Sequence, residues 1–266
     1  MKRILITGAN SYIGVSFKTF LNENFSGEYV VDSVSLRDGT WRDMSFAGYD
    51  TIFHTAGIVH IRETKKNAHL YYEINRDMTL ELAGKAKADG VSQFVFLSSM
   101  SVYGLDTGII TRDTVPRPKS NYGISKLQAE EGLNKLEDDS FRIAILRPPM
   151  VYGEGCKGNY NAIIKLVKTF PFFPKVNNRR SMIHIDRLSN FVRTLIDKDS
   201  RGLFFPQDEE YMNTSALAKI IAAGMGKKIY CSRLLGFCVK CLMPFSRTAR
   251  KAFGDLIYQF MGEPEV

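Results

Sequence analysis

A tyrosine and a lysine stand four residues apart at the start of a helical stretch, at Tyr122 and Lys126. Residues at this spacing lie on one helix face, so the phenol and the ammonium point into the same space. A tyrosine titrates near pH ~10, so its use as a base at neutral pH requires roughly 4 kcal/mol of phenolate stabilisation. A lysine charge roughly 4 Å away in a partly desolvated site supplies about that much. The pair predicts acid–base chemistry, with a solvated tyrosine beside a surface lysine as the alternative.

A glycine segment near the N-terminus has the context of a phosphate-binding turn. Gly8-Ala-Asn-Ser-Tyr-Ile-Gly14 follows a short apolar run at 3–7 and precedes a helical pattern at 15–23. This order of strand, turn and helix is what a dinucleotide fingerprint requires. Gly8 allows a tight turn, Gly14 allows the helix to pack closely on the strand, and the helix N-terminus offers free backbone N–H groups to a pyrophosphate. A glycine-bounded turn without a ligand is the alternative.

Strands and helices alternate along the first 150 residues. Strands are expected at 3–7, 28–36, 50–56, 93–98 and 141–147, and helices at 15–23, 69–88 and 121–136. This alternation favours an α/β fold with a Rossmann-type, doubly wound parallel sheet and helices on both faces. The ligand is then expected at the carboxyl ends of the strands.

The pattern changes after Pro148-Pro149. Helical patterns at 159–169, 186–197 and 214–224 are separated by prolines and a strand-like stretch at 202–206. We therefore expect a dinucleotide-binding domain over residues 1–150 and a smaller, mainly helical substrate-binding lobe with a basic C-terminal segment over 151–266. Later segments of the chain can return to the first domain.

The composition is that of an ordinary soluble globular protein of 266 residues. We find neither a signal-peptide core at the N-terminus nor an apolar run of membrane-spanning length. Four cysteines in a chain of this size do not suggest a disulfide scaffold, so a reducing cytoplasm is expected. Cys238 and Cys241 have redox or zinc spacing, but no second pair accompanies them in their apolar stretch, so we expect two core thiols and no metal site.

The net charge of +8 is concentrated near the C-terminus. Basic residues there alternate with leucine and phenylalanine, and they are Lys227, Lys228, Arg233, Lys240, Arg247, Arg250 and Lys251. Such a segment could bind an anionic surface, either membrane or nucleic acid. We favour a solvated helix face or a basic rim around an anionic substrate. No nucleic-acid partner is expected, while weak contact with a membrane surface stays open.

Seven motifs occur in a characteristic order. They are Thr7-Gly8-x-x-Ser11-x-x-Gly14, His54-Thr-Ala-Gly57, Asn75, Ser98-Ser-Met-Ser-Val-Tyr-Gly104, Tyr122-x-x-x-Lys126, Arg147-Pro-Pro-Met-Val-Tyr-Gly153 and Arg180-Ser-Met-Ile-His184. As a set they resemble the extended short-chain dehydrogenases/reductases of the NAD-dependent nucleotide-sugar epimerase and dehydratase family, with the UDP-glucose 4-epimerases as the nearest type. The resemblance runs from residue 1 to about residue 206 and then fades.

The resemblance implies a role for individual residues. It makes Tyr122 the acid/base, Lys126 both its electrostatic partner and a ribose ligand, and Ser99 the hydroxyl that orients the sugar oxygen. Ser101 is the neighbour most easily confused with Ser99. The positions that it assigns to cofactor binding are Gly8, Ser11, Tyr12, Ile13, Gly14, Asp32, Ala56, Asn75 and Lys126. Asn159 and Arg180 match positions that hold the nucleotide diphosphate, and an ordinary surface arginine is the alternative for Arg180.

The choice of cofactor rests on two residues. Asp32 lies twenty-four residues after Gly8, near the place where an acid binds the adenosine ribose and favours NAD. The segment Ser35-Leu-Arg-Asp38 also resembles one that follows the third strand and lines the adenine. In that case the second and third strand regions are shorter than usual. Asp32 would then lie in the middle of a strand, and Arg37 could meet the 2′-phosphate of NADP. We favour NAD, with NADP as the alternative.

Three departures from the family pattern bear on function. Ser11 replaces the middle glycine of the fingerprint, and Met150 stands where many members carry an asparagine against the sugar nucleotide. Met100-Ser101 replaces the acidic pair with which dehydratases remove a hydroxyl, which argues against 4,6-dehydration.

The resemblance therefore implies an NAD(P)-dependent nucleotide-sugar epimerase that acts at C4 through a transient 4-keto sugar. An NAD(P)H-dependent 4-keto-sugar reductase is the alternative. A non-catalytic dinucleotide sensor is disfavoured because it would be expected to lose Tyr122 or Lys126, and both are present. Homodimers are common in such families, often through a four-helix interface that would include the helix of Tyr122.

Overall fold

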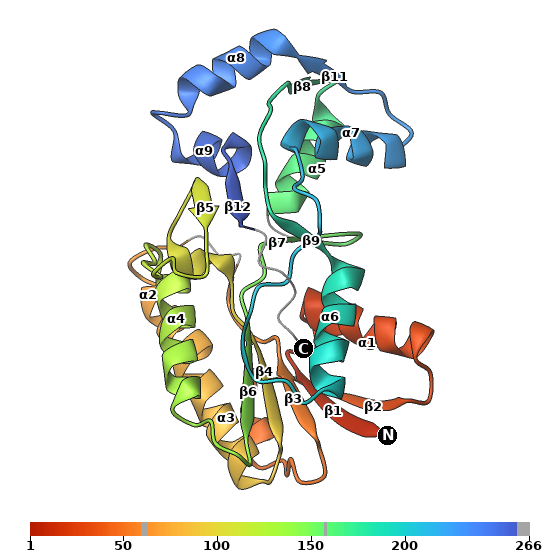
Figure 1. Cartoon of the computed structure of the whole chain (residues 1–266), viewed down its shortest axis with the longest axis vertical. Helices are drawn as coiled ribbons and strands as arrows, with labels where there is room; N and C mark the ends of the chain where they lie inside the picture. Colours follow the sequence, from red (N-terminus) through yellow and green to blue (C-terminus); the bar gives the residue numbers. More distant parts are fainter. Residues whose placement is uncertain (60–62, 157–158, 260–266) are drawn as a thin grey trace.

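A computed structural model of the chain describes residues 1–59, 63–156 and 159–259, with the backbone alone described at Asn159. A sheet domain forms one end of the molecule, and a smaller lobe of helices forms the other (Figure 1). The chain begins in the sheet domain, at the end remote from that lobe.

The sheet domain has the doubly wound architecture that the sequence predicts. Its strands lie in the order β10-β6-β4-β3-β1-β2, and each pairs in parallel with its neighbours. They are β1 (Lys2–Thr7), β2 (Tyr29–Val34), β3 (Thr51–His54), β4 (Gln93–Leu97), β6 (Arg142–Leu146) and β10 (Gly202–Phe204). β3 and β4 are buried at every position, as expected of parallel strands covered on both faces. The predicted fold class is confirmed.

Helices cover both faces of the sheet. α3 (Met78–Ala88) and α4 (Asn121–Asn134) pack on one face, where Leu82 and Leu133 meet Phe94 and Phe96 in one apolar cluster. α1 (Tyr12–Asn24) and α6 (Ile185–Asp197) pack on the other face, where a second cluster contains the alternate residues of β4, Val95 and Leu97. The alternation of side chains along a strand thus divides the core into two layers.

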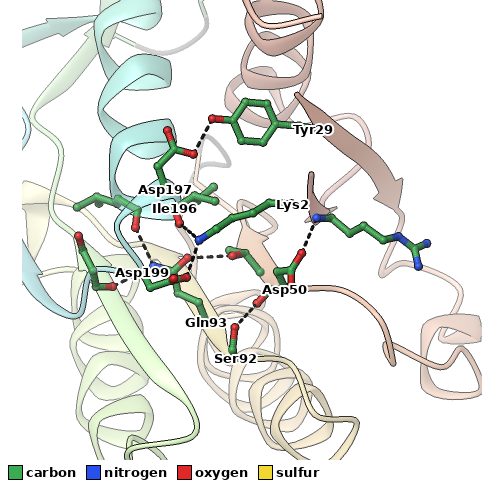
Figure 2. Close-up of polar contacts among 12 residues, drawn as sticks. Lys2, Tyr29, Asp50, Ser92, Gln93, Ile196, Asp197 and Asp199 are labelled. Atoms are coloured by element: carbon green, nitrogen blue, oxygen red, sulfur yellow. Dashed lines mark hydrogen bonds and ion pairs between the residues drawn. The ribbon is translucent and has the colours of Figure 1, made fainter. Parts of the chain in front are cut away.

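The second half of the chain returns to the sheet through α6 and β10. Figure 2 shows how the end of α6 is held: the Lys2 ammonium donates to the carbonyl of Ile196 and to Asp199, at 2.7 Å from the carboxylate. The Tyr29 hydroxyl donates to Asp197 at 2.6 Å. Because β10 then pairs with β6, the sheet domain contains segments from both sides of residue 150.

The lobe has its own apolar core, in which Ile163, Val167, Phe173, Leu217 and Ile221 are buried together. Its helices are α5 (Asn159–Thr169), α7 (Thr214–Gly224), α8 (Arg233–Leu242) and α9 (Arg247–Phe253), and its strands are β8 (Phe172–Pro174) and β11 (Tyr230–Ser232). Two further parallel ladders connect the regions: β7 (Met150–Tyr152) with β9 (Met182–His184), and β5 (Gly108–Ile110) with β12 (Leu256–Tyr258).

The helix expected at 69–88 is interrupted. It consists of α2 (Ala68–Tyr72), one π-helical turn η2 (Glu73–Asp77) and α3. A π-helical turn adds a residue to one turn and often marks a functional region. Here it contains Asn75, which is fully buried and points toward the ligand cavity wall described below.

Candidate active site

A cavity of about 1150 Å³ lies at the carboxyl ends of the strands. Its wall combines the turn at 8–13, the loop at 55–59, the segment that follows β4, the start of α4 and parts of the lobe, including Arg180 and α9. This is where a doubly wound sheet is expected to hold its ligand. Pockets for one small-molecule ligand usually measure about 300–1000 Å³, so this cavity is large enough for two small molecules side by side.

The glycine turn has the geometry of a cradle. Gly8 has a φ of +90°, and a Cβ there would lie 3.0 Å from backbone atoms of Ala56. A Cβ on Gly14 would lie 2.9 Å from the side chain of Ile6, so this glycine lets α1 pack closely on β1. Ser11, in place of the middle glycine, is the N-cap of α1 and accepts from the Gly14 N–H. The serine therefore has a capping role that leaves the turn intact.

Asn75 and Gly14 lie behind the cavity wall instead of on it. The Asn75 side chain accepts from the Ile58 N–H at 2.9 Å and donates to the Ile58 carbonyl at 3.0 Å. Its amide also lies 3.3 Å from the Ser125 hydroxyl. A Cβ on Gly57 would come within 2.8 Å of the Asn75 oxygen. Asn75 therefore positions the loop that forms the wall, and its direct contact with a cofactor stays a prediction.

Tyr122 and Ser99 meet on the cavity wall. Tyr122 lies in the first turn of α4, whose N-cap is Ser120, and Ser99 follows β4. Burial raises the pKa of Tyr122 to about 12, a hydrogen bond with Ser99 opposes that rise, and Tyr71 adds to it. The sequence predicts a phenolate stabilised by Lys126, but among the described residues burial outweighs the other influences on this phenol. Stabilisation of the phenolate by Lys126 stays a prediction.

Lys126 is 3% exposed and, like Tyr122 on the same helix, lines the cavity. Its ammonium donates to the carbonyl of Leu97 at 2.9 Å and lies 4.5 Å from the centre of the Phe96 ring. Burial lowers the pKa of Lys126 to about 7, and the nearby Glu130 carboxylate opposes that change. The two predicted catalytic groups are therefore together, with their pKa values displaced in opposite directions because water is excluded from both.

A buried ionic network supports this helix and was not predicted from the sequence. Arg147 pairs with Glu130 at 2.5 Å and donates to the Tyr103 hydroxyl at 2.8 Å. The Ser98 hydroxyl donates to Glu130, and the Tyr258 hydroxyl donates to the carbonyl of Arg147 at 2.7 Å. The available signal was the spacing of Glu130, four residues after Lys126, on the same helix face.

Comparison with known proteins agrees with this geometry. The family described as "NAD dependent epimerase/dehydratase family" matches residues 4–203. The chain belongs to this family. A UDP-glucose 4-epimerase of Vibrio cholerae is 29% identical, over 88% of this chain and 81% of that protein. An N-acetyl-alpha-D-glucosaminyl-diphospho-ditrans,octacis-undecaprenol 4-epimerase of Escherichia coli O157:H7 is 25% identical, over 85% and 73% of the two chains.

Solved structures of the epimerase/dehydratase fold include reductases as well as epimerases. A dTDP-4-dehydrorhamnose reductase from Yersinia enterocolitica superposes with a TM-score of 0.72 at 20% identity, over 98% of this chain and 92% of that one. A UDP-glucuronic acid 4-epimerase from Bacillus cereus, in complex with NAD, superposes with a TM-score of 0.70 at 20% identity, over 86% of each chain. These similarities show the fold.

Asp32 lies away from the cavity of this epimerase/dehydratase family member. It is in mid-strand, and the Tyr49 hydroxyl donates to its carboxylate at 2.8 Å. Among the described residues on the cavity wall, the end of β2 contributes Ser35, Leu36 and Arg37 instead. The strand that follows β2 in the described chain is β3, and it pairs directly with β1. The second and third strand regions are therefore compressed, as the alternative in the sequence analysis supposed. Arg37 is the charged residue at the end of β2 on the cavity wall, and the assignment of Asp32 to cofactor binding stays a prediction.

The remaining predicted cofactor residues Ser11, Tyr12, Ile13 and Ala56 line the cavity together with Gly8. On the lobe side, Arg180 also lines it, is half-buried, and donates to the carbonyl of Gly254 at 2.9 Å. Burial lowers the pKa of Arg180. Arg247 and Lys251 of α9 join it on the wall and were predicted only as part of the basic segment. The side chain of Asn159 lies outside the described residues.

Proposed function

We propose that the protein is an NAD(P)-dependent epimerase that inverts C4 of a sugar carried on a diphosphate. The observation that supports this proposal most directly is that Tyr122, Ser99 and Lys126 meet on the wall of one large cavity, where Lys126 is almost fully buried. The glycine turn, which also lines the cavity, fits a dinucleotide because Gly8 makes a tight turn there with a φ of +90° and α1 begins directly after the turn. The Vibrio cholerae relative is named for the same reaction.

The turn at Gly8 and the start of α1 would hold NAD(P), which would supply the hydride acceptor and donor for C4. The residues of the chain move the proton. Tyr122 takes the proton of the C4 hydroxyl and later returns it to the 4-keto oxygen, and Ser99 orients that oxygen. A positive charge on Lys126 lowers the pKa of the Tyr122 phenol, and Glu130 favours that charge. Arg180 binds the diphosphate from the lobe side of the cavity.

A 4-keto-sugar reductase is the second candidate, favoured by two observations. Arg37, on the cavity wall at the end of β2, suits the 2′-phosphate of NADP. A UDP-2-acetamido-2,6-beta-L-arabino-hexul-4-ose reductase of Pseudomonas aeruginosa is 25% identical over 73% of this chain and 48% of that protein. The same tyrosine and serine would then donate a proton to a ketone that arrives from solution. Four cysteines in a chain of this size fit a reducing cytoplasm for either reaction.

The test separates the two candidates by the fate of the cofactor. Purified protein is incubated with UDP-, GDP- and dTDP-sugars and with a polyprenyl-diphosphate sugar, with and without NADH or NADPH, and the sugars are analysed by NMR. Inversion at C4 without net loss of reduced cofactor supports the epimerase. Stoichiometric loss of NAD(P)H on a 4-keto sugar supports the reductase.

A matched pair of tyrosine variants tests the site itself. Tyr122→Phe is expected to lower kcat by at least about 1000-fold, because the proton carrier is lost. Tyr72→Phe is the control, since that hydroxyl bonds to Asn121 at 2.7 Å beside the same helix but does not line the cavity. Full activity in Tyr122→Phe would exclude both mechanisms.

A further inference from the structure

α8 turns its apolar face away from the protein. Gly236 is the one buried residue of this helix, which is described throughout. A Cβ on Gly236 would lie 2.1 Å from the carbonyl oxygen of Lys175, so the helix rests on the lobe at this glycine. The outer side carries residues at the helical spacings of three and four, namely Leu234, Phe237, Cys238, Cys241 and Leu242.

These side chains are exposed to solvent. The exposed fractions are 72% for Leu234, 65% for Phe237 and 52% for Leu242, and Phe245, just after the helix, is 88% exposed. In a helix on the surface of a soluble domain the apolar stripe normally faces the core. α8 has the reverse orientation, and contiguous exposed apolar surface usually marks an interaction site. The expectation that Cys238 and Cys241 are core thiols is wrong, because both are exposed.

The lobe that carries α8 is strongly basic. Its segments 159–180 and 211–254 contain thirteen lysines and arginines and no aspartate or glutamate. These segments form the end of the molecule remote from the β1–β2 edge (Figure 1). On α8 itself, Arg233 and Lys240 are seven residues apart, which is about two helical turns. Both therefore lie along the same edge of the apolar face. A solvated helix face accounts for the charges but leaves the exposed leucine and phenylalanine side chains unexplained.

We propose that α8 and Phe245 dock on the surface of an anionic lipid bilayer. The apolar face enters the boundary between headgroups and acyl chains, and Arg233 and Lys240 lie against lipid phosphates. A nucleic acid would satisfy the charges but offers no apolar phase for Leu234 and Phe237. No helix within the described ranges is long and apolar enough to cross a membrane, so the contact is peripheral. This inference is independent of the reaction proposed above.

Co-sedimentation of the full chain with vesicles tests the apolar contact. Vesicles of phosphatidylglycerol and phosphatidylcholine are expected to bind the protein, and pure phosphatidylcholine vesicles to bind it much less. The double variant Leu234→Ser/Phe237→Ser is expected to lower the partition coefficient by about tenfold or more. Val30→Ser is the control, because Val30 is an exposed apolar residue of β2 at the opposite end of the molecule.

The charges are tested in the same assay. Arg233→Glu/Lys240→Glu is expected to weaken binding by at least about 30-fold, and Lys65→Glu/Lys66→Glu, exposed on the sheet domain, is the control with an equal change in net charge. Loss of binding at high salt in the native protein would agree with this result. Equal pelleting of the α8 variants and their controls would overturn the proposal.

A tryptophan placed on the helix reports its depth. Trp41 is the single tryptophan of the chain and is 1% exposed, so its emission gives a constant background. Phe237→Trp is expected to shift its emission to the blue on anionic vesicles and to be quenched by brominated acyl chains. Unchanged emission on vesicles would contradict insertion. A stable dimer without lipid that the Leu234→Ser/Phe237→Ser variant abolishes would also overturn the proposal, because α8 would then be an interface between two copies.

Discussion

The ammonium of Lys126 donates a hydrogen bond to the carbonyl of Leu97, with 2.9 Å between nitrogen and oxygen. Leu97 is the last residue of β4, and Ser98 and Ser99 follow it directly. The bond therefore joins the helix that carries Tyr122 to the strand end that carries Ser99. It also leaves the ammonium in a nearly dry place, beside Phe96, where its protonation responds strongly to nearby charge.

Lys126 is expected to destabilise the folded chain at neutral pH. Its pKa is lowered from 10.5 to about 7 by folding. Between these values the unfolded chain holds the proton and the folded chain does not, so the free energy of unfolding falls as the pH decreases from about 10.5 to 7. Lys126→Met removes this cost, and we expect its Tm at pH 7 to exceed that of the native protein by roughly 5 °C.

Thermal unfolding at several pH values checks this sign. The gain in Lys126→Met is expected to shrink as the pH rises from 7 toward 10.5 and to vanish above that value, where the native lysine is neutral in both states. Lys135→Met, at the exposed end of the same helix, serves as the control and should change Tm little at any pH. A lower Tm for Lys126→Met at pH 7 than for the native protein would show that the hydrogen bond to Leu97 outweighs the cost of burial.

Ser99 and Ser101 are expected to differ in their contribution to catalysis. Both line the cavity, but the hydrogen bond that opposes the raised pKa of Tyr122 comes from Ser99. Ser99→Ala should therefore lower kcat by about 100-fold, whereas Ser101→Ala should lower it by less than about threefold. The alkaline titration of Tyr122, followed by absorbance, should move to higher pH in Ser99→Ala alone. Equal effects of the two variants would mean that the tyrosine does not depend on Ser99.

The sequence predicts the fold because the fold depends on local patterns, and the site residues stay predictions that rest on the same patterns. Buried strands followed by helices define the sheet order of a doubly wound fold, and the motif positions follow the strand ends. The positions of Tyr122, Ser99 and Gly8 on one cavity wall are consistent with this reasoning. The return of β10 to β6 is a long-range pairing that no local pattern specifies.

Side-chain direction and burial depend on tertiary contacts, so the surroundings of three predicted site residues could not be derived from the sequence. Asp32 stands at a suitable distance along the chain from Gly8, but its strand directs it to Tyr49. Asn75 has the right position in the family pattern, but the π-helical turn points it at the backbone of Ile58. The pKa of Tyr122 was expected to fall because only the lysine could be seen in the sequence, whereas the burial that raises it could not.

Arg37 is expected to determine preference for the phosphorylated cofactor. Its side chain lines the cavity at the end of β2, while Asp32, which would have repelled a 2′-phosphate, is held by Tyr49. A hydrogen bond to a charged group contributes about 1.5–3 kcal/mol, so Arg37→Ala should weaken NADPH binding by roughly 10- to 100-fold. NADH binding, measured by calorimetry on the same protein, should change by less than about threefold. Equal losses for the two cofactors would exclude recognition of the 2′-phosphate by this residue.

Glu130 is expected to affect both stability and the pH dependence of activity. Glu130→Gln leaves the buried Arg147 without its counter-charge, and breaking such a pair usually costs about 3–5 kcal/mol. The same variant removes the carboxylate that raises the pKa of Lys126. If the cationic lysine is the active form, kcat/KM of the native enzyme falls on the alkaline side near pH 7, and this limb should move to lower pH in Glu130→Gln.

Two comparison variants separate these effects of Glu130. Glu131→Gln also removes one negative charge from α4, but from its exposed side. It should alter neither Tm nor the pH profile of kcat/KM. Glu130→Leu/Arg147→Met removes both charges, so it should be more stable than Glu130→Gln, because no ion is left buried alone. The alkaline limb of its kcat/KM profile should nevertheless move to lower pH, as in Glu130→Gln, since the Glu130 carboxylate is absent from both variants. An unshifted limb in Glu130→Gln would show that Lys126 does not govern the pH dependence.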